Sequence, residues 1–324
     1  MGNKAPCQGS GQENGPLLLC AMIACAIVLG CSAVAFAKDG DKDSDNDDSG
    51  TKSSPAWPTT YLDMRTSYAS VPAGSLPIGF GNTALVTALE SLALSTGSSL
   101  SALPKNLPSN LSLASRQGVA IDFPLTVDVT DHVSLYAGVS GTATNTSGQG
   151  WSSFDITSWN VGFQADLYDQ KGGKIPTITW QSTYTQSIPN DTLGTTTFNN
   201  ILEFDYALDK DETRGLLAGV QDVRVEVGTA LATIHPSDIF YAGGYYQWPS
   251  NWKFTGRFGV QYFGGAELLR FTPVQSFTQP VLRLDLDRMD DNDNRLFGVT
   301  AEIMWVPKPA YLLMLRTPLY MVRN

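Results

Sequence analysis

The stretch Phe154–Ser187 constrains the fold more than any other part of the chain. In its first arm Trp159, Val161 and Phe163 alternate with polar residues, so that apolar and polar side chains fall on opposite faces of an extended strand. Residues 169–174 then supply the glycines of a reversal, and a second alternating arm follows. The pattern predicts a long β-hairpin with one apolar and one polar face.

Both arms are longer than the about 5–6 residues usual in soluble sheets. They approach the about 9–11 residues that a tilted strand needs to cross a bilayer. The alternation recurs along the chain and predicts twelve strands, at residues 60–71, 118–129, 132–145, 153–169, 174–187, 197–209, 213–227, 238–248, 252–264, 269–288, 294–306 and 310–323. An even number of strands suits a closed, up-and-down antiparallel β-barrel, so the predicted fold class is all-β and transmembrane.

The connections between these strands alternate in length. Short polar turns are predicted at 130–131, 170–173, 210–212, 249–251 and 290–293, and longer connections at 72–117, 146–152, 188–196, 228–237 and 265–268. Short turns at one end and long loops at the other are typical of outer-membrane barrels, whose short turns are periplasmic. Residues 306–309 depart from this pattern because they are short on the long-loop side.

The two faces of the strands favour a lipid-facing exterior and a polar lumen. Residues 281–287 alternate leucine with Arg283, Asp285 and Asp287, and residues 220–227 alternate valine with charged residues. A soluble sheet with one solvated face explains any single strand but not twelve of them. The candidate lumen-lining residues are Asp166, Glu203, Asp205, Asp222, Arg224, Glu226, Arg257, Arg283, Asp285, Asp287, Glu302 and Arg316. Both signs occur, so some should pair, for selectivity or as a purely structural polar core.

The N-terminal region predicts a signal peptide at residues 1–37. Leu17–Ala37 is apolar and ends in a small-x-small pattern, so cleavage is predicted after Ala37; a retained anchor is the alternative. All four cysteines lie in this leader, and Cys31 has a loose resemblance to a lipidation site. Because the predicted mature chain contains no cysteine, it offers no disulfide or thiolate chemistry.

Residues 38–58 are predicted to form a disordered acidic linker, and residues 59–324 the barrel. The linker is rich in Asp, Ser and Lys and has almost nothing to bury. Its Asp and Asn residues could supply calcium ligands, but the glycine and glutamate of an EF-hand loop are not at the required positions. The formal net charge of −10 argues against a nucleic-acid partner.

The longest connection contains leucines at helical spacing at residues 83–94. The pattern predicts a short amphipathic helix within the early loop 72–117. This helix could plug the lumen, cap the barrel from outside, or belong to an ordinary surface loop.

An enzyme would need a nucleophile and a base, and the predicted mature chain offers only His132 and His235 as histidines. His132 lies in a turn beside Asp131. His235 and Ser237 resemble the His-x-Ser core of the outer-membrane phospholipase, but Pro236 between them would disturb a strand that must present both side chains. A hydrolase is therefore a remote alternative, and no catalytic, cofactor or metal residue is predicted.

The sequence also resembles a known family. The residues that carry the resemblance are 125–136, LTVDVTDHVSLY, followed by the hairpin 159–187 and residues 200–213. They are similar to the Gram-negative outer-membrane β-barrel family of the phenol-degradation meta-pathway, also labelled transporter-like, and the similarity covers about residues 118–260. The resemblance implies a channel or transporter for small solutes, hydrophobic or aromatic ones among them.

The expected location is the outer membrane of a Gram-negative bacterium. The expected partners are the lipid bilayer and lipopolysaccharide, the barrel-insertion machinery and small-molecule solutes. A non-transporting barrel with a structural or surface-interaction role is the main alternative.

Overall fold

The structure is a computed structural model that describes residues 59–72, 115–146, 150–188, 194–228, 232–268, 271–274, 276–290, 295–305 and 308–322. The predicted signal peptide, acidic linker and loop helix at 83–94 lie outside these residues and stay predictions. No helix in the described part of the chain has the length and hydropathy of a membrane span.

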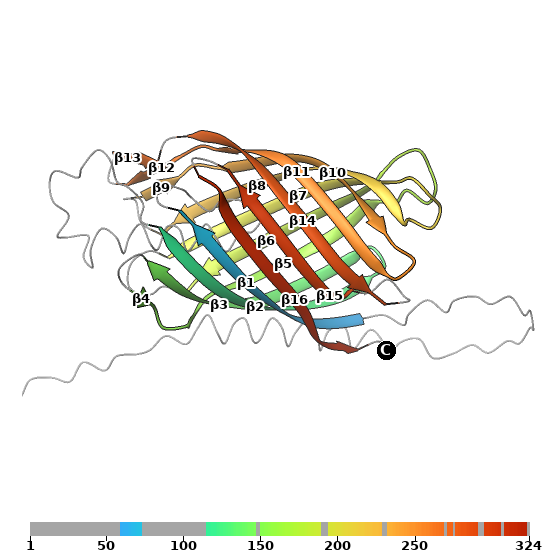
Figure 1. Cartoon of the computed structure of the whole chain (residues 1–324), viewed down its shortest axis with the longest axis horizontal. Coiled ribbons are helices and arrows are strands. Elements are labelled where there is room, and N and C mark those ends of the chain that lie inside the picture. The colour runs from blue at the N-terminus through green and yellow to red at the C-terminus, as the bar shows by residue number, and fades with distance from the viewer. Residues whose placement is uncertain are drawn as a thin grey trace, which may run out of the picture. The chain divides into compact units, whose positions relative to one another are not determined.

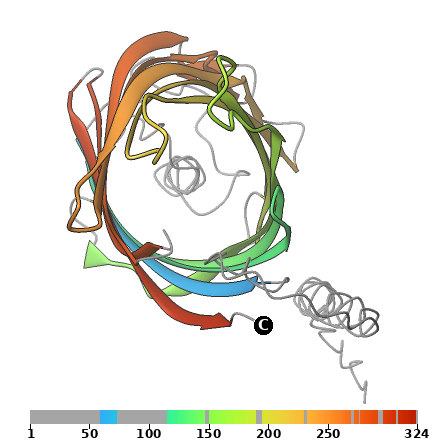
Figure 2. The ribbon, with the colours of Figure 1, turned by 90° about the vertical axis from the view of Figure 1, so that its right-hand side faces the viewer.

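Within the described residues, twelve strands form one closed antiparallel barrel (Figures 1 and 2), which confirms the predicted fold class. These strands are β1 (Thr59–Val71), β2 (Arg116–Thr130), β3 (Val133–Thr146), β5 (Asp155–Tyr168), β6 (Thr177–Ser187), β7 (Thr195–Ala207), β8 (Arg214–Val227), β10 (Ser237–Gln247), β11 (Trp252–Phe263), β14 (Phe277–Met289), β15 (Arg295–Met304) and β16 (Ala310–Val322). Each strand pairs with the barrel strand before and after it, and β1 pairs with β16 to close the ring.

Four short strands lie outside this ring. β4 (Gly150–Trp151) pairs with the end of β3, and β9 (Ala232–Ile234), β12 (Ala266–Leu268) and β13 (Phe271–Val274) form a small sheet in the order β13-β12-β9. The strand predicted at 269–288 is therefore two strands, β13 and β14. The reason is that β13 pairs with β12, and so follows the small sheet, whereas β14 pairs with β11 and β15 in the barrel wall.

The barrel has a short-turn end and a long-loop end. At the short-turn end, residues 131–132, 169–176, 208–213, 248–251 and 290–294 connect successive strands. In the turn between β5 and β6, Lys171 and Gly172 have φ values of 43° and 74°, the left-handed backbone that a tight reversal uses. β4 and the small sheet lie at the opposite, long-loop end (Figure 1). This is the alternation of connection lengths that the sequence predicts.

Contacts between strands that are not neighbours identify the inner face. Arg257 on β11 is bonded to Glu203 on β7, although β8 and β10 lie between these strands. Tyr136 on β3 donates a hydrogen bond to the carbonyl oxygen of Ser182 on β6, across β5. Side chains of strands that are not neighbours reach each other most readily on the concave face of a curved sheet, which in a closed barrel is the inner face. The strand register then assigns every second residue of each strand to the same inner face.

The outer face is largely apolar. Phe240, Phe258, Leu216 and Leu313 occupy outer positions on four strands and are 53–61% exposed. A soluble protein rarely exposes an apolar surface that continues from strand to strand in this way. Exposed aromatic residues near strand ends are Trp151, Trp248, Tyr262, Trp305, Tyr311 and Tyr320. An apolar band with aromatic residues at its borders is the surface that a barrel presents to lipid.

Candidate functional site

The inner wall is the candidate functional site, and nine of the predicted lumen residues lie on it. They are Asp166, Glu203, Asp205, Arg257, Arg283, Asp285, Asp287, Glu302 and Arg316. The register also places Leu282, Leu284 and Leu286 on the outer face, as the alternation predicts.

The other three residues, Asp222, Arg224 and Glu226, lie on the outer face, so the predicted orientation of residues 222–227 is corrected. Gln221 of the same strand is inside, where its side-chain amide donates a hydrogen bond to Asn199. Val223 and Val225 are also inside and pack with Ile234, Phe263 and Ala266. Alternation separates two sets of side chains without telling which set faces inward. Near the long-loop end the inner face packs against apolar residues that the strand's own sequence does not include.

A group of ion pairs, the arginine bridge, joins three strands of the inner wall. Nε of Arg257 lies 3.1 Å from Oε2 of Glu203, and Nη1 of Arg257 lies 3.0 Å from Oδ2 of Asp285. Nε of Arg283 lies 3.1 Å from the same carboxylate of Asp285, which is 6% exposed. Tyr241 donates a hydrogen bond of 2.8 Å to Glu203. The arginine bridge therefore supplies each of these poorly hydrated charges with a partner, as burial requires.

A second group of inner charges includes four residues that the sequence prediction missed, namely Asp63, Arg65, Asp122 and Arg295. Arg316 pairs with Asp63, and Nε of Arg295 lies 3.1 Å from Oδ1 of Asp287. Arg65 on β1 and Asp122 on β2 are opposite each other in register. The same two-residue alternation that selected the other candidates would have selected Arg65 and Asp122, since both lie within predicted strands.

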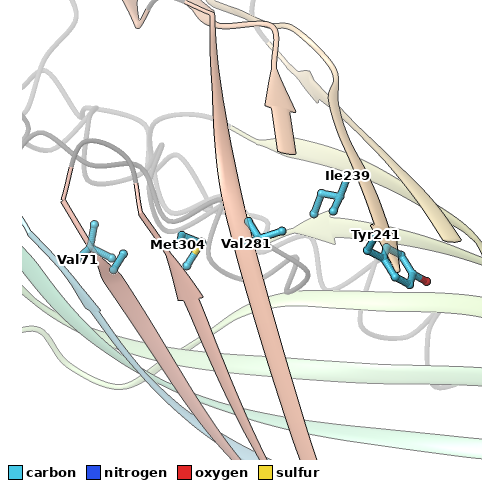
Figure 3. Packing of buried hydrophobic residues seen from close by; sticks show 6 residues of the cluster. Val71, Ile239, Tyr241, Val281 and Met304 are labelled. Atoms are coloured by element: carbon cyan, nitrogen blue, oxygen red, sulfur yellow. The ribbon is translucent and has the colours of Figure 1, made fainter. Parts of the chain in front are cut away.

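An inner apolar patch lies beside the arginine bridge. It consists of Val71, Ile239, Tyr241, Val281, Met304 and Ala310, and Figure 3 shows the five labelled side chains along the sheet. The strand register puts Val281 and Met304 opposite each other. The charged pair Arg283 and Glu302 lies two residues along the same strands, at the next inner position. This part of the wall is therefore apolar on one row of residues and charged on the next.

The wall formed by β3, β5, β6 and β7 is mostly neutral and hydrogen-bonding. Its inner positions include Ser140, Thr142, Ser158, Asn160, Gln164, Thr179, Gln181, Thr183, Thr185, Thr197 and Asn199. Thr179 donates a hydrogen bond of 2.8 Å to Asp166 near the short-turn end. This wall offers hydroxyl and amide groups where the opposite wall offers charges and apolar side chains.

A cavity of about 370 Å³ opens at the short-turn end. Among the described residues, its lining includes one lysine, Lys171, and one histidine, His132. It also includes five carboxylates, those of Asp131, Asp166, Asp169, Asp205 and Glu212. We call this region the acidic mouth. It joins residues from three turns that are far apart in the sequence, which the strand pattern alone could not show.

The turn between β7 and β8 carries a further carboxylate, Asp209. The hydroxyl of Thr213 donates a 2.6 Å hydrogen bond to Oδ2 of Asp209, and its backbone N–H donates one of 2.8 Å to Oδ1. Chiefly through the side-chain hydrogen bond, Thr213 holds the pKa of Asp209 below its ordinary value. Asp209 is therefore negatively charged at neutral pH and adds to the acidic character of this end.

The two histidines lie at opposite ends of the barrel. Nε2 of His132 lies 3.6 Å from Asp131, and Nε2 of His235 lies 3.5 Å from Glu267. The hydroxyl of Ser237 accepts a hydrogen bond of 2.7 Å from Gln261. His235 and Ser237 thus have different partners. Within the part of the chain that the structure describes, no three His, Cys, Asp or Glu side chains are grouped to hold a metal ion.

Known protein families and curated proteins give no match to the chain. Solved structures do. The COG4313 outer membrane channel from Pseudomonas putida F1 is similar with a TM-score of 0.52 at 9% identity, over 84% of this chain and 100% of that chain. The translocator domain of the autotransporter NalP from Neisseria meningitidis gives a TM-score of 0.43 at 10% identity, over 91% of this chain and 96% of that chain. At this identity the first likeness shows the fold, that of an outer-membrane β-barrel, and the second adds no argument.

Proposed function

We propose that the barrel lies in the outer membrane of a Gram-negative bacterium and conducts small solutes along its inner wall. One observation carries the proposal. The closed sheet has an apolar outer face and an inner face that holds both the arginine bridge and the acidic mouth. Burying so many charges in a packed protein core would be energetically unfavourable, whereas charged side chains commonly line a path for aqueous solutes.

The outer surface supports the membrane location. Mid-strand residues such as Phe240 and Phe258 are exposed, and exposed tryptophans and tyrosines lie near the strand ends. This arrangement suits contact with the lipid bilayer and lipopolysaccharide after insertion by the barrel-insertion machinery. We propose with it that residues 1–37 are a signal peptide cleaved after Ala37, residues 38–58 a linker, and residues 59–324 the barrel.

The inner wall supports small solutes rather than large ones. A barrel of twelve strands is wider than the eight-stranded kind that side chains fill and narrower than open sixteen-stranded porins. The resemblance to the family of the phenol-degradation meta-pathway supports solutes with a hydrophobic or aromatic portion, and the likeness to a solved outer membrane channel supports the barrel fold.

The test is ion conductance of refolded protein in planar bilayers. We expect discrete current steps and a preference for cations, because carboxylates dominate the acidic mouth. Replacing Asp169 by Asn and Glu212 by Gln should lower the cation-to-anion permeability ratio by a factor of about two. The matched control is Asp211→Asn, which removes a carboxylate from the same turn as Glu212 but not from the cavity lining. A correctly refolded barrel that stays silent across salts and solutes would refute the channel.

A structural or surface-interaction barrel is the second candidate. It is favoured by the tight packing of part of the inner wall, where Ile239, Gln261 and Val281 are 0% exposed. This candidate predicts that no continuous water path runs through the lumen. The conductance experiment separates the two, because only the channel passes current.

A further inference from the structure

A repeated contact on the inner wall pairs a tyrosine with a glycine on the neighbouring strand. Among the described residues there are three such pairs in direct register: Tyr136 with Gly162, Tyr241 with Gly219, and Tyr245 with Gly215. A Cβ atom added at any of these glycines would stand 2.5 Å from Cζ of the tyrosine opposite. Since real Cβ atoms essentially never come within 3.0 Å of another heavy atom, each ring occupies the space of the missing side chain.

Each tyrosine then reaches the strand beyond its glycine. Tyr136 crosses β5 and donates to the carbonyl oxygen of Ser182 on β6 at 3.1 Å. Tyr241 crosses β8 and donates to Glu203 on β7 at 2.8 Å. Tyr245 crosses β8 in the same way and is hydrogen-bonded to Asp205 on β7. A ring that spans the neighbouring strand to bond the next one must lie along the wall and cannot point toward the barrel axis.

Tyr245 gives the clearest example, because two neighbouring residues define the position of its ring. The ring fills the space of a side chain at Gly215, and Nζ of Lys253 lies over the ring, 4.3 Å from its centroid. The three atoms nearest to a Cβ at Gly215 all belong to Tyr245, whereas those at Gly162 and Gly219 include backbone oxygens. Tyr245 also lines the acidic mouth. A side chain at Gly215 would therefore displace this ring toward the cavity.

We propose that Gly162, Gly215 and Gly219 determine the size limit for solutes, by allowing the three tyrosines to lie flat and keep the lumen wide. This inference rests on the proposed channel function and adds to it the residues that determine the width of the lumen. Tyr241 has a second role as a positioning residue, since the carboxylate that it bonds, Glu203, is the one that pairs with Arg257.

The test compares single-channel conductance and solute flux of Gly215→Ala with those of Gly256→Ala. Gly256 is on the outer face, and a Cβ there would meet its nearest atom, on Phe254, at an ordinary distance of 3.6 Å. We expect Gly215→Ala to reduce conductance to about half or less and to exclude larger solutes first. Gly256→Ala should conduct like the wild type.

A double variant separates a moved ring from a damaged barrel. Gly215→Ala combined with Tyr245→Ala removes the displaced ring, so conductance should return at least to the wild-type level. If Gly215→Ala leaves both conductance and the size limit unchanged in a wild type that conducts, this inference is overturned and the channel stands. If the double variant stays reduced, the loss has another cause and the inference is also overturned. A silent wild type overturns both proposals.

Discussion

Phe258→Arg should prevent or strongly weaken insertion of the barrel. Phe258 lies in the middle of β11, faces outward between Ala242 and Leu282, and is 59% exposed. An arginine on the lipid face near the bilayer midplane costs about 2–4 kcal/mol. The measurement is the free energy of unfolding in lipid vesicles, followed by urea titration and tryptophan fluorescence.

The matched control places the same charge on the inner face. Gln164 is exposed at an inner position of β5, opposite Gln181 on β6. Gln164→Arg should leave the free energy of unfolding close to that of the wild type, because the arginine stays in a polar environment. Equal stability losses in the two variants would mean that the assignment of inner and outer faces is wrong.

Arg257→Met should destabilise the barrel because it removes the central cation of the arginine bridge. Glu203 would lose its arginine, and Asp285 would keep Arg283 and the hydroxyl of Thr300 as partners. Breaking a fully buried ion pair costs about 3–5 kcal/mol of stability. Because the side chains of Arg257 and Glu203 are 20% and 24% exposed, we expect Arg257→Met to lower the free energy of unfolding by about 2 kcal/mol. The cation preference of the current should rise, because the wall loses a positive charge.

A double-mutant cycle checks the assignment of this loss. Glu203→Gln in the Arg257→Met background removes the carboxylate that has lost its partner, so most of the lost stability should return. If Arg257→Met is as stable as the wild type, or if the second substitution adds a further independent loss, the arginine bridge is not an energetic unit. Unfolding in urea measures the wild type, the two single variants and the double variant under the same conditions.

The sequence was sufficient to predict the barrel strands, apart from the division of 269–288 into β13 and β14, because a barrel wall repeats one local rule. The side chain of Leu284 lies on the outer face and that of Arg283 on the inner face. When such alternation recurs in twelve segments, few folds other than a membrane-spanning barrel are compatible with the sequence. The rule failed at Asp222, Arg224 and Glu226. There the inner valines pack with Ile234 and Phe263, and a strand's own alternation contains no information about partners that arrive from other segments.

The candidate site was predictable only in part for a similar reason. Arg257 and Asp285 were recognised as inner residues, but their joint pairing with Glu203 depends on which strands curve together. The contact of Tyr245 with Gly215 depends on the register of β8 and β10, which neither residue reveals by itself. The acidic mouth likewise forms only when separate turns meet at one end of the closed barrel.

The central claim is that the inner face lines a path for aqueous solutes, and cysteine accessibility during conduction tests it most directly. In a chain whose leader cysteines at 7, 20, 25 and 31 are replaced by serine, one cysteine is placed at Gln164 on the inner face or at Phe163 on the outer face. A charged, water-soluble thiol reagent is then added to an open channel. We expect the current of Gln164→Cys to fall and that of Phe163→Cys to stay unchanged. A current that responds only at Phe163→Cys, or a refolded barrel that carries no current, would contradict the account.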